Sequence, residues 1–167
     1  MIKYKIFEVL SAQEPVDVAN EKWTRTREKI EGINSGVGMA TFYRHFWSAN
    51  YSRASSGRLY DAFKKTIKPA AEQRYSCFLD EMLVFADYYS QIVEPDLKYY
   101  KNRQEYRWLV QSLREITDIF NVVQVRVPLM ALIHAKTTDV ISMDYYKKAV
   151  SYLENFHFAF NVVVSDR

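Results

Sequence analysis

The sequence predicts an all-α fold, a single bundle-like domain of about seven or eight helices over residues 1–167. Apolar residues recur at intervals of three and four along most of the chain, which is the period of an amphipathic helix. Hydrophobic residues make up 49% of the chain, enough to form a core. There are only four glycines and four prolines, and so few turn-forming residues disfavour a β-sandwich.

Two helices are expected before the clearest break in the chain. The first covers residues 2–10. The second covers residues 15–31, where a proline suits the first turn and Glu21 and Arg25 are spaced to pair one turn apart. The segment 32–38 follows, and three of its seven residues are glycine. This segment is therefore predicted to end the second helix.

Three further helices are expected up to residue 93. A short aromatic helix over 42–51 precedes a polar loop at 52–57, whose serines can cap the next helix over 58–67. The segment 70–93, which follows a Lys-Pro boundary, has the longest regular alternation of apolar and polar residues. It is predicted to form the longest helix.

The C-terminal part is predicted to form three more helices. One covers residues 106–120. The β-branched run 122–127 is also compatible with a strand, but no partner strand is evident, so it is interpreted as a connection into a helix with Pro128 in its first turn. Ser142 is expected to cap the final helix.

The helical period also predicts which side chains form the core. From the middle of the chain onward, one apolar stripe is expected to be buried in each long helix. Side chains predicted to be buried include Phe63, Phe78, Met82, Leu113 and Phe156. In the final helix the residues expected to face inward are Tyr145, Ala149, Tyr152, Leu153, Phe156 and Phe160.

Charge and cysteine content restrict the class of protein. The formal net charge is +3, which is compatible with nucleic-acid binding without indicating it. Cys77, the single cysteine, has no partner for an internal disulfide and is expected to be a small core residue. A reducing, cytoplasmic location is predicted. No apolar run approaches the ~18 residues of a membrane span, so no membrane association is predicted.

No motif of catalytic or metal chemistry is found. His45, His134 and His157 are widely spaced, and Cys77 has no second cysteine near it, so no metal site is predicted. The pair Gly36-Val-Gly38 lacks the third glycine and the preceding strand of a phosphate-binding loop. We therefore predict no catalytic residue and no cofactor within this chain.

A polar cluster on the final helix is the first of two candidate sites. Glu154, His157 and Asn161 share one flank at helical spacing. A carboxylate beside an imidazole is able to act as an acid/base pair. The alternative interpretation is a solvated or interface flank, and it is preferred because no nucleophile or metal site accompanies the cluster.

A basic segment is the second candidate site. Between Phe42 and Lys68 there are six cationic residues and one acidic residue, Asp61. Aromatic residues are interspersed among the cations, as in many nucleic-acid interfaces. Because the aromatics fall on the apolar helix face, a solvated basic face is the alternative to a phosphate-binding surface. The six cations are Arg44, Arg53, Arg58, Lys64, Lys65 and Lys68.

Four segments resemble a known family. Phe42–Trp47 fits the pattern F-x-R-H-[YF]-W, and Arg58–Lys65 contains the pattern L-Y-x-x-F-K. Val127–Ile133 is similar to an x-P-L-L-L-A-L helix start, and Tyr152–Asn161 to an I-E-x-F-x-F-R-x-N helix, with Ala159 where a polar or basic residue is expected. The chain thus resembles the domain-of-unknown-function family at the N-terminal side of GmrSD-type, modification-dependent restriction proteins.

The resemblance implies a role within a larger protein. Members carry an upstream ParB-like region linked to nucleotide handling, and many carry a downstream HNH-type nuclease region. Neither region is found here, so the chain is expected to be a fragment, while the parent protein would be a nucleotide-dependent endonuclease. The leading hypothesis is a non-catalytic scaffold whose partners are the neighbouring domains. The alternative is an autonomous nucleic-acid-binding module that uses the Arg44–Lys68 basic face.

Overall fold

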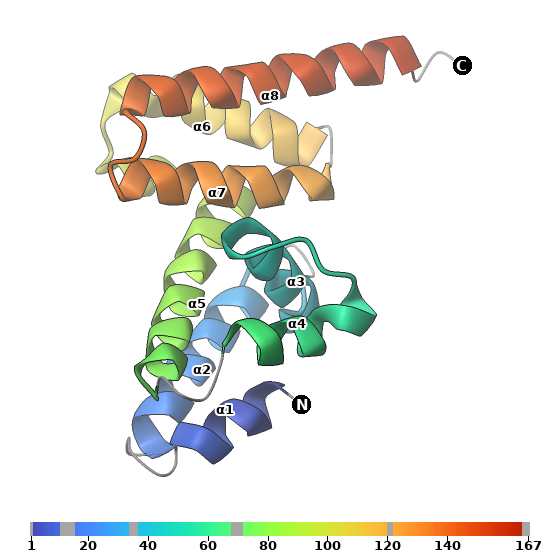
Figure 1. Cartoon of the computed structure of the whole chain (residues 1–167). Coiled ribbons are helices and arrows are strands. Elements are labelled where there is room, and N and C mark those ends of the chain that lie inside the picture. Colours follow the sequence, from blue (N-terminus) through green and yellow to red (C-terminus); the bar gives the residue numbers. More distant parts are fainter. Residues whose placement is uncertain (1, 11–15, 34–36, 68–71, 120–121, 165–167) are drawn as a thin grey trace. The chain divides into compact units, whose positions relative to one another are not determined.

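The computed structural model describes residues 2–10, 16–33, 37–67, 72–119 and 122–164, and in these ranges the fold is all-α, as predicted (Figure 1). No strand occurs among the described residues. The eight α-helices are α1 (Ile2–Leu10), α2 (Val16–Glu31), α3 (Met39–Asn50), α4 (Leu59–Thr66), α5 (Glu72–Val93), α6 (Arg107–Arg114), α7 (Arg126–Thr137) and α8 (Met143–Val164).

Short helical turns connect several of these helices. Four are 3₁₀ turns, and a single π-helical turn at Glu115–Ile119 directly continues α6. The 3₁₀ turns lie at Ser56–Arg58, Leu97–Tyr100, Gln104–Tyr106 and Val123–Val125. The last of these confirms the prediction that residues 122–127 connect into a helix, because α7 begins at Arg126 with Pro128 in its first turn.

Contacts within the chain divide it into two compact units, an N-terminal unit (Met1–Asp87) and a C-terminal unit (Tyr88–Arg167). The boundary falls within α5. Each unit has its own buried apolar residues and is described by itself. A single domain over residues 1–167 stays a prediction.

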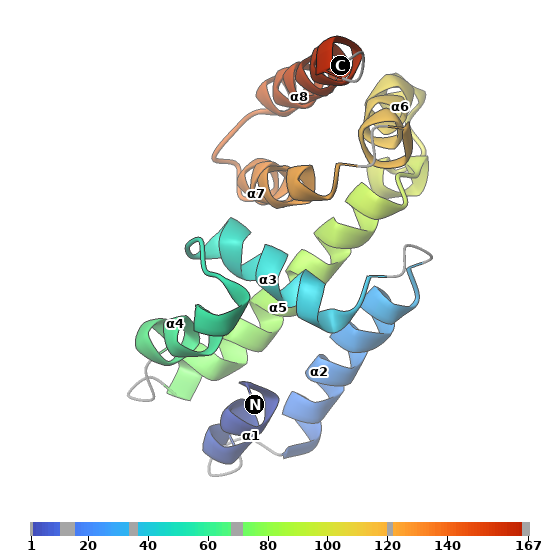
Figure 2. The same ribbon diagram turned by 90° about the vertical axis from the view of Figure 1, so that its right-hand side faces the viewer.

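The core of the N-terminal unit is a cluster of aromatic rings between α3 and α5, and Figure 2 shows these two helices crossing. On α3, Phe42, Phe46 and Trp47 are fully buried because their spacing places them on one helix face. The ring centroid of Phe46 lies 5.5 Å from that of Phe78 and 5.1 Å from that of Phe85, both in edge-to-face geometry. This arrangement is favourable for aromatic pairs beyond the area that they bury.

Polar contacts also connect α5 to the helices beside it. The ammonium group of Lys22 on α2 lies 2.9 Å from the Asp80 carboxylate, and Asn50, the last residue of α3, donates a hydrogen bond of 3.0 Å to Glu81. The predicted pair of Glu21 and Arg25 forms, at 3.7 Å, on the exposed side of α2. Such surface pairs contribute little each, so the aromatic cluster supplies most of the stabilisation.

In the C-terminal unit, α8 packs against both α6 and α7. The buried residues of this unit include Leu109, Leu113, Ile116, Leu129, Met130, Ile133, Tyr146 and Val150. One cation lies within this interior. Arg126 is only 8% exposed, and its guanidinium donates a hydrogen bond of 3.2 Å to the Tyr89 hydroxyl and lies 5.7 Å from the centroid of the Tyr89 ring. The cation–π contact and this hydrogen bond partly replace the water that a buried guanidinium loses.

The predicted inward face of α8 is wrong. Phe63, Phe78, Met82 and Leu113 are buried as expected, but Phe156 is 61% exposed, and Tyr145, Tyr152 and Phe160 are exposed with it. Instead, Tyr146 and Val150 are fully buried. The physical reason is that α8 is apolar on two faces. Its period identifies both faces, while packing against α6 and α7 determines which one is covered.

The burial predicted for Cys77 is also wrong. Its side chain is exposed on α5. The buried stripe of this helix runs through Phe78, Met82 and Phe85. Cys77 precedes Phe78 by one residue, a rotation of about 100° around the helix, and therefore lies outside the stripe.

Candidate nucleic-acid interface

Helix α4 is anchored on one side and leaves its basic side open. Leu59 and Phe63 on α4 and Ile67 just after it are buried. Lys65 lies on the opposite side of α4, and Arg58, the last residue of the 3₁₀ turn before α4, is seven residues earlier and thus nearly aligned with it. The expected serine cap is not seen. A 3₁₀ turn leads into α4, and neither the turn nor α4 has a side-chain capping hydrogen bond.

A hollow of about 630 Å³ lies between this side of α4 and the loop before it. It is lined by Arg53, Ala54, Ser55, Arg58, Asp61, Ala62 and Lys65. Three of the six predicted cations therefore gather around one depression, and we call this surface the basic hollow. Arg53, Arg58 and Lys65 are all exposed.

Two further predicted cations, Lys64 and Arg44, do not line the basic hollow. Lys64 forms an ion pair of 2.9 Å with Asp61 and lies 4.6 Å from the Tyr60 ring centroid. The hydrogen bond between Lys64 and Asp61 lowers the pKa of Asp61 and raises the pKa of Lys64 from their ordinary values. Arg44 lines a different hollow, and Lys68 falls outside the described residues.

The charge balance of the basic hollow is positive. Among the described residues that line it, Asp61 is the only acidic one, and Lys64 offsets that charge. Arg53, Arg58 and Lys65 therefore leave an excess of positive charge in a surface depression. Exposed guanidinium and ammonium groups donate hydrogen bonds readily to phosphate oxygens, so the hollow is suited to bind a phosphate backbone.

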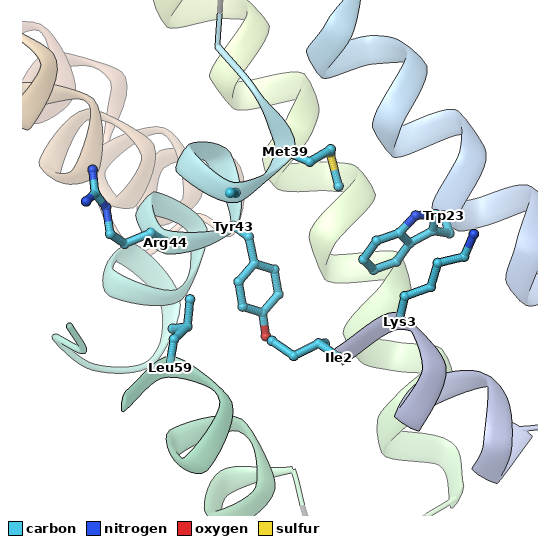
Figure 3. Close-up of a pocket in the computed structure, with 8 residues that line it drawn as sticks. Ile2, Lys3, Trp23, Met39, Tyr43, Arg44 and Leu59 are labelled. Carbon is cyan, nitrogen blue, oxygen red and sulfur yellow. The ribbon is translucent and has the colours of Figure 1, made fainter. Parts of the chain in front are cut away.

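A second hollow, of about 360 Å³, lies among α1, α2, α3 and α4 (Figure 3). Its lining is mostly apolar and consists of Ile2, Lys3, Trp23, Met39, Ala40, Tyr43, Arg44 and Leu59. In Figure 3 the Arg44 guanidinium points away from Tyr43, and the Lys3 ammonium lies over the Trp23 ring. Sequence reasoning did not find this hollow, because its residues come from four separate helices.

Tyr43 carries a buried hydroxyl in this second hollow. Its oxygen has no hydrogen-bond partner among the described residues, and burial raises the pKa of Tyr43 far above its ordinary value. Replacing Tyr43 with phenylalanine removes this hydroxyl and keeps the ring. Because an unpaired buried hydroxyl costs free energy, we expect the free energy of unfolding to stay unchanged or to rise by up to about 1 kcal/mol. Urea titration measures it, and a loss above about 1 kcal/mol would show that the hydroxyl is paired.

The predicted polar cluster on α8 is not brought into one site. Glu154 is directed towards Ser112 and Glu115, while Asn161 donates a hydrogen bond of 2.9 Å to the backbone carbonyl of His157. His157 and Asn161 do line a common hollow of about 330 Å³, together with Val122, Gln124, Phe156 and Phe160. Glu154 does not line this hollow. The geometry therefore offers no support for an acid/base pair of Glu154 and His157.

The environment of Glu154 predicts a pH dependence of stability. Loss of hydration raises the pKa of this carboxyl, and the nearby Glu115 adds to the effect. A raised pKa means that the native state keeps a proton that the unfolded state has already lost, so stability falls as the pH rises through this interval. We expect Glu154→Gln to be more stable than wild type at neutral pH, with the difference vanishing below the ordinary glutamate pKa of about 4.3. Thermal unfolding of both proteins at neutral pH and below the ordinary glutamate pKa measures this difference. If the variant and wild type differ in stability by the same amount at the two pH values, the expectation is wrong.

No described helix has the length and apolar character needed to cross a bilayer. Among the described residues, no three potential ligands from His, Cys, Asp and Glu gather closely enough to hold a metal ion.

Compared with known proteins, the chain matches no family model, no curated protein and no solved structure.

Proposed function

We propose that this chain is a non-catalytic helical module that binds the phosphate backbone of nucleic acid through the basic hollow. The observation that carries the proposal is the grouping of Arg53, Arg58 and Lys65 around one open depression. None of the three forms an ion pair with a described acidic residue. Their charges are therefore available to phosphates.

The geometry also indicates what kind of binding to expect. Flexible cations on a loop and on one helix face contact phosphates rather than base edges, so they carry little sequence information. Three phosphate contacts give weak, non-specific affinity, with a dissociation constant on the order of 10⁻⁴ to 10⁻⁶ M. Such a module would add affinity to a larger protein without determining its target.

A second proposed function is that of a scaffold domain in a restriction-like, phage-defence protein of the cytoplasm. The support is that the Phe42–Trp47 motif behind the resemblance supplies core residues: Phe42, Tyr43, Phe46 and Trp47 are all buried. A motif of this kind specifies a fold rather than a reaction. In this proposal the chain positions a nucleotide-handling region relative to a nuclease region of the same parent protein.

The salt dependence of DNA binding tests the first proposal. Fluorescence anisotropy with a labelled duplex is measured over a range of salt concentrations. Three phosphate contacts predict a slope of log K against log salt of about −2.7, so that affinity falls about 40-fold between 50 and 200 mM. Two duplexes of unrelated sequence should bind equally. Absence of binding even at low salt would contradict the proposal and favour the scaffold.

A further inference from the structure

Helix α8 has an apolar face that remains exposed. Its buried side, with Tyr146 and Val150, packs within the C-terminal unit. On another side are four aromatic residues with large exposed fractions: Tyr145 (69%), Tyr152 (74%), Phe156 (61%) and Phe160 (52%). At about 100° per residue, all four lie within about 80° of the helix circumference. We call this surface the α8 seam.

The spacing of the α8 seam is that of a helix-pairing surface. Ala149 and Ala159 fall between the aromatic residues, so positions 145, 149, 152, 156 and 159 follow the alternating 4-3 spacing of a coiled-coil stripe. The stripe therefore holds three large aromatic side chains and two small alanines. A second helix can approach closely at the alanines while the rings pack around it.

The area of the α8 seam is close to what a specific interface requires. A fully covered aromatic residue buries about 150–250 Å², so four that are more than half exposed present about 400–600 Å² of apolar surface. Two copies together would bury about 800–1,200 Å² from these residues alone, and a specific interface requires about 1,000 Å² in total. Residues flanking the seam add to this area.

The two halves of the α8 seam complement each other in an antiparallel arrangement. Tyr145 and Tyr152 lie in the first half of α8. Phe156 and Phe160 lie in the second half, where they also line the hollow of about 330 Å³ that His157 shares. An antiparallel neighbour would place its first half against this hollow. A tyrosine ring would then meet the phenylalanines, and its hydroxyl would meet the polar groups of Gln124, His157 and Asn161.

We propose that the α8 seam pairs antiparallel with the α8 seam of a second copy, so that the chain is a homodimer. The proposal is independent of the basic hollow. A lipid surface is the competing occupant of an exposed aromatic face, but the charges of α8 favour protein. Interfacial helices are rich in lysine and arginine, whereas the charged residues of α8, Asp144, Lys147, Lys148 and Glu154, balance to zero.

Analytical ultracentrifugation of the full chain over a range of concentrations tests the proposal. Wild type is expected to be a dimer, and Tyr152→Lys combined with Phe156→Lys is expected to weaken dimerisation at least about 100-fold, because two charges would be buried in each seam. The control is Val140→Lys combined with Tyr4→Lys, which adds the same charges at residues that are 75% and 77% exposed outside the seam. This control should remain dimeric. Circular dichroism confirms that both variants are folded.

A wild-type chain that stays monomeric at all concentrations would overturn the proposal, as would a seam variant that dimerises like wild type. Co-sedimentation of a monomeric wild type with phosphatidylcholine/phosphatidylserine vesicles would assign the α8 seam to lipid instead. Direction is tested by disulfide cross-linking in a Cys77→Ser background. Tyr145→Cys mixed with Ala159→Cys should cross-link more than either variant alone. The opposite result would contradict the antiparallel arrangement.

Discussion

Replacing Phe46 with alanine is expected to destabilise the N-terminal unit by about 3–5 kcal/mol. The side chain is fully buried, and its ring contacts Phe42 and Tyr43 on its own helix, Tyr51 beyond it, and Phe78 and Phe85 on α5. Truncation removes these contacts and leaves a cavity that rigid neighbouring rings cannot fill. The free energy of unfolding from urea titration measures the effect.

An exposed aromatic residue provides the matched control. Tyr4 on α1 is 77% exposed, so Tyr4→Ala should change the free energy of unfolding by no more than about 0.5 kcal/mol. If Phe46→Ala costs less than about 1 kcal/mol, the aromatic cluster does not hold α3 against α5 as the structure indicates.

Reversing two charges of the basic hollow, by combining Arg58→Glu with Lys65→Glu, is expected to lower DNA affinity at low salt by at least about tenfold. The magnitude of the salt slope should decrease by about 2, because each lost phosphate contact removes about one unit. The helical content measured by circular dichroism should stay the same, since both side chains are exposed and α4 is anchored through Leu59 and Phe63.

A control with the same change in net charge separates a local site from general attraction. Lys101 and Arg107 are exposed cations of the C-terminal unit, and combining Lys101→Glu with Arg107→Glu also lowers the net charge by four. This control should retain most of the affinity and the salt slope. If both double variants lose affinity equally, net charge rather than the basic hollow accounts for the binding.

Local sequence signals predicted most of the secondary structure. Helix α1 covers the expected residues 2–10, α2 ends at Glu31 where the glycine-rich segment begins, and α5 ends at Val93 before a proline. The backbone nitrogen of Tyr145 donates a hydrogen bond of 3.3 Å to the Ser142 hydroxyl, as expected for a cap of the final helix. These features depend on residues within a few positions of one another, and for that reason they are readable from the sequence.

The composition of the two candidate sites was only partly predictable. Arg58 and Lys65 share one face of a short helix, which the helical period indicates directly. The contribution of Arg53 to the same hollow depends on the path of the loop before α4, and no period describes a loop. Glu154 does not line the hollow that His157 lines, because it is directed towards Ser112 and Glu115. Those two residues lie about 40 positions earlier in the chain, beyond the reach of a local pattern.

For α8, the sequence alone does not determine which face of the helix is buried. Its period correctly places Tyr145, Tyr152 and Phe156 on one face and Tyr146 and Val150 on another. Both faces are apolar, so local preference alone does not distinguish the buried one from the exposed one. The hydrophobic effect favours covering either face. Which face is buried therefore depends on the position of α6 and α7 relative to α8, because these two helices pack against only one of them.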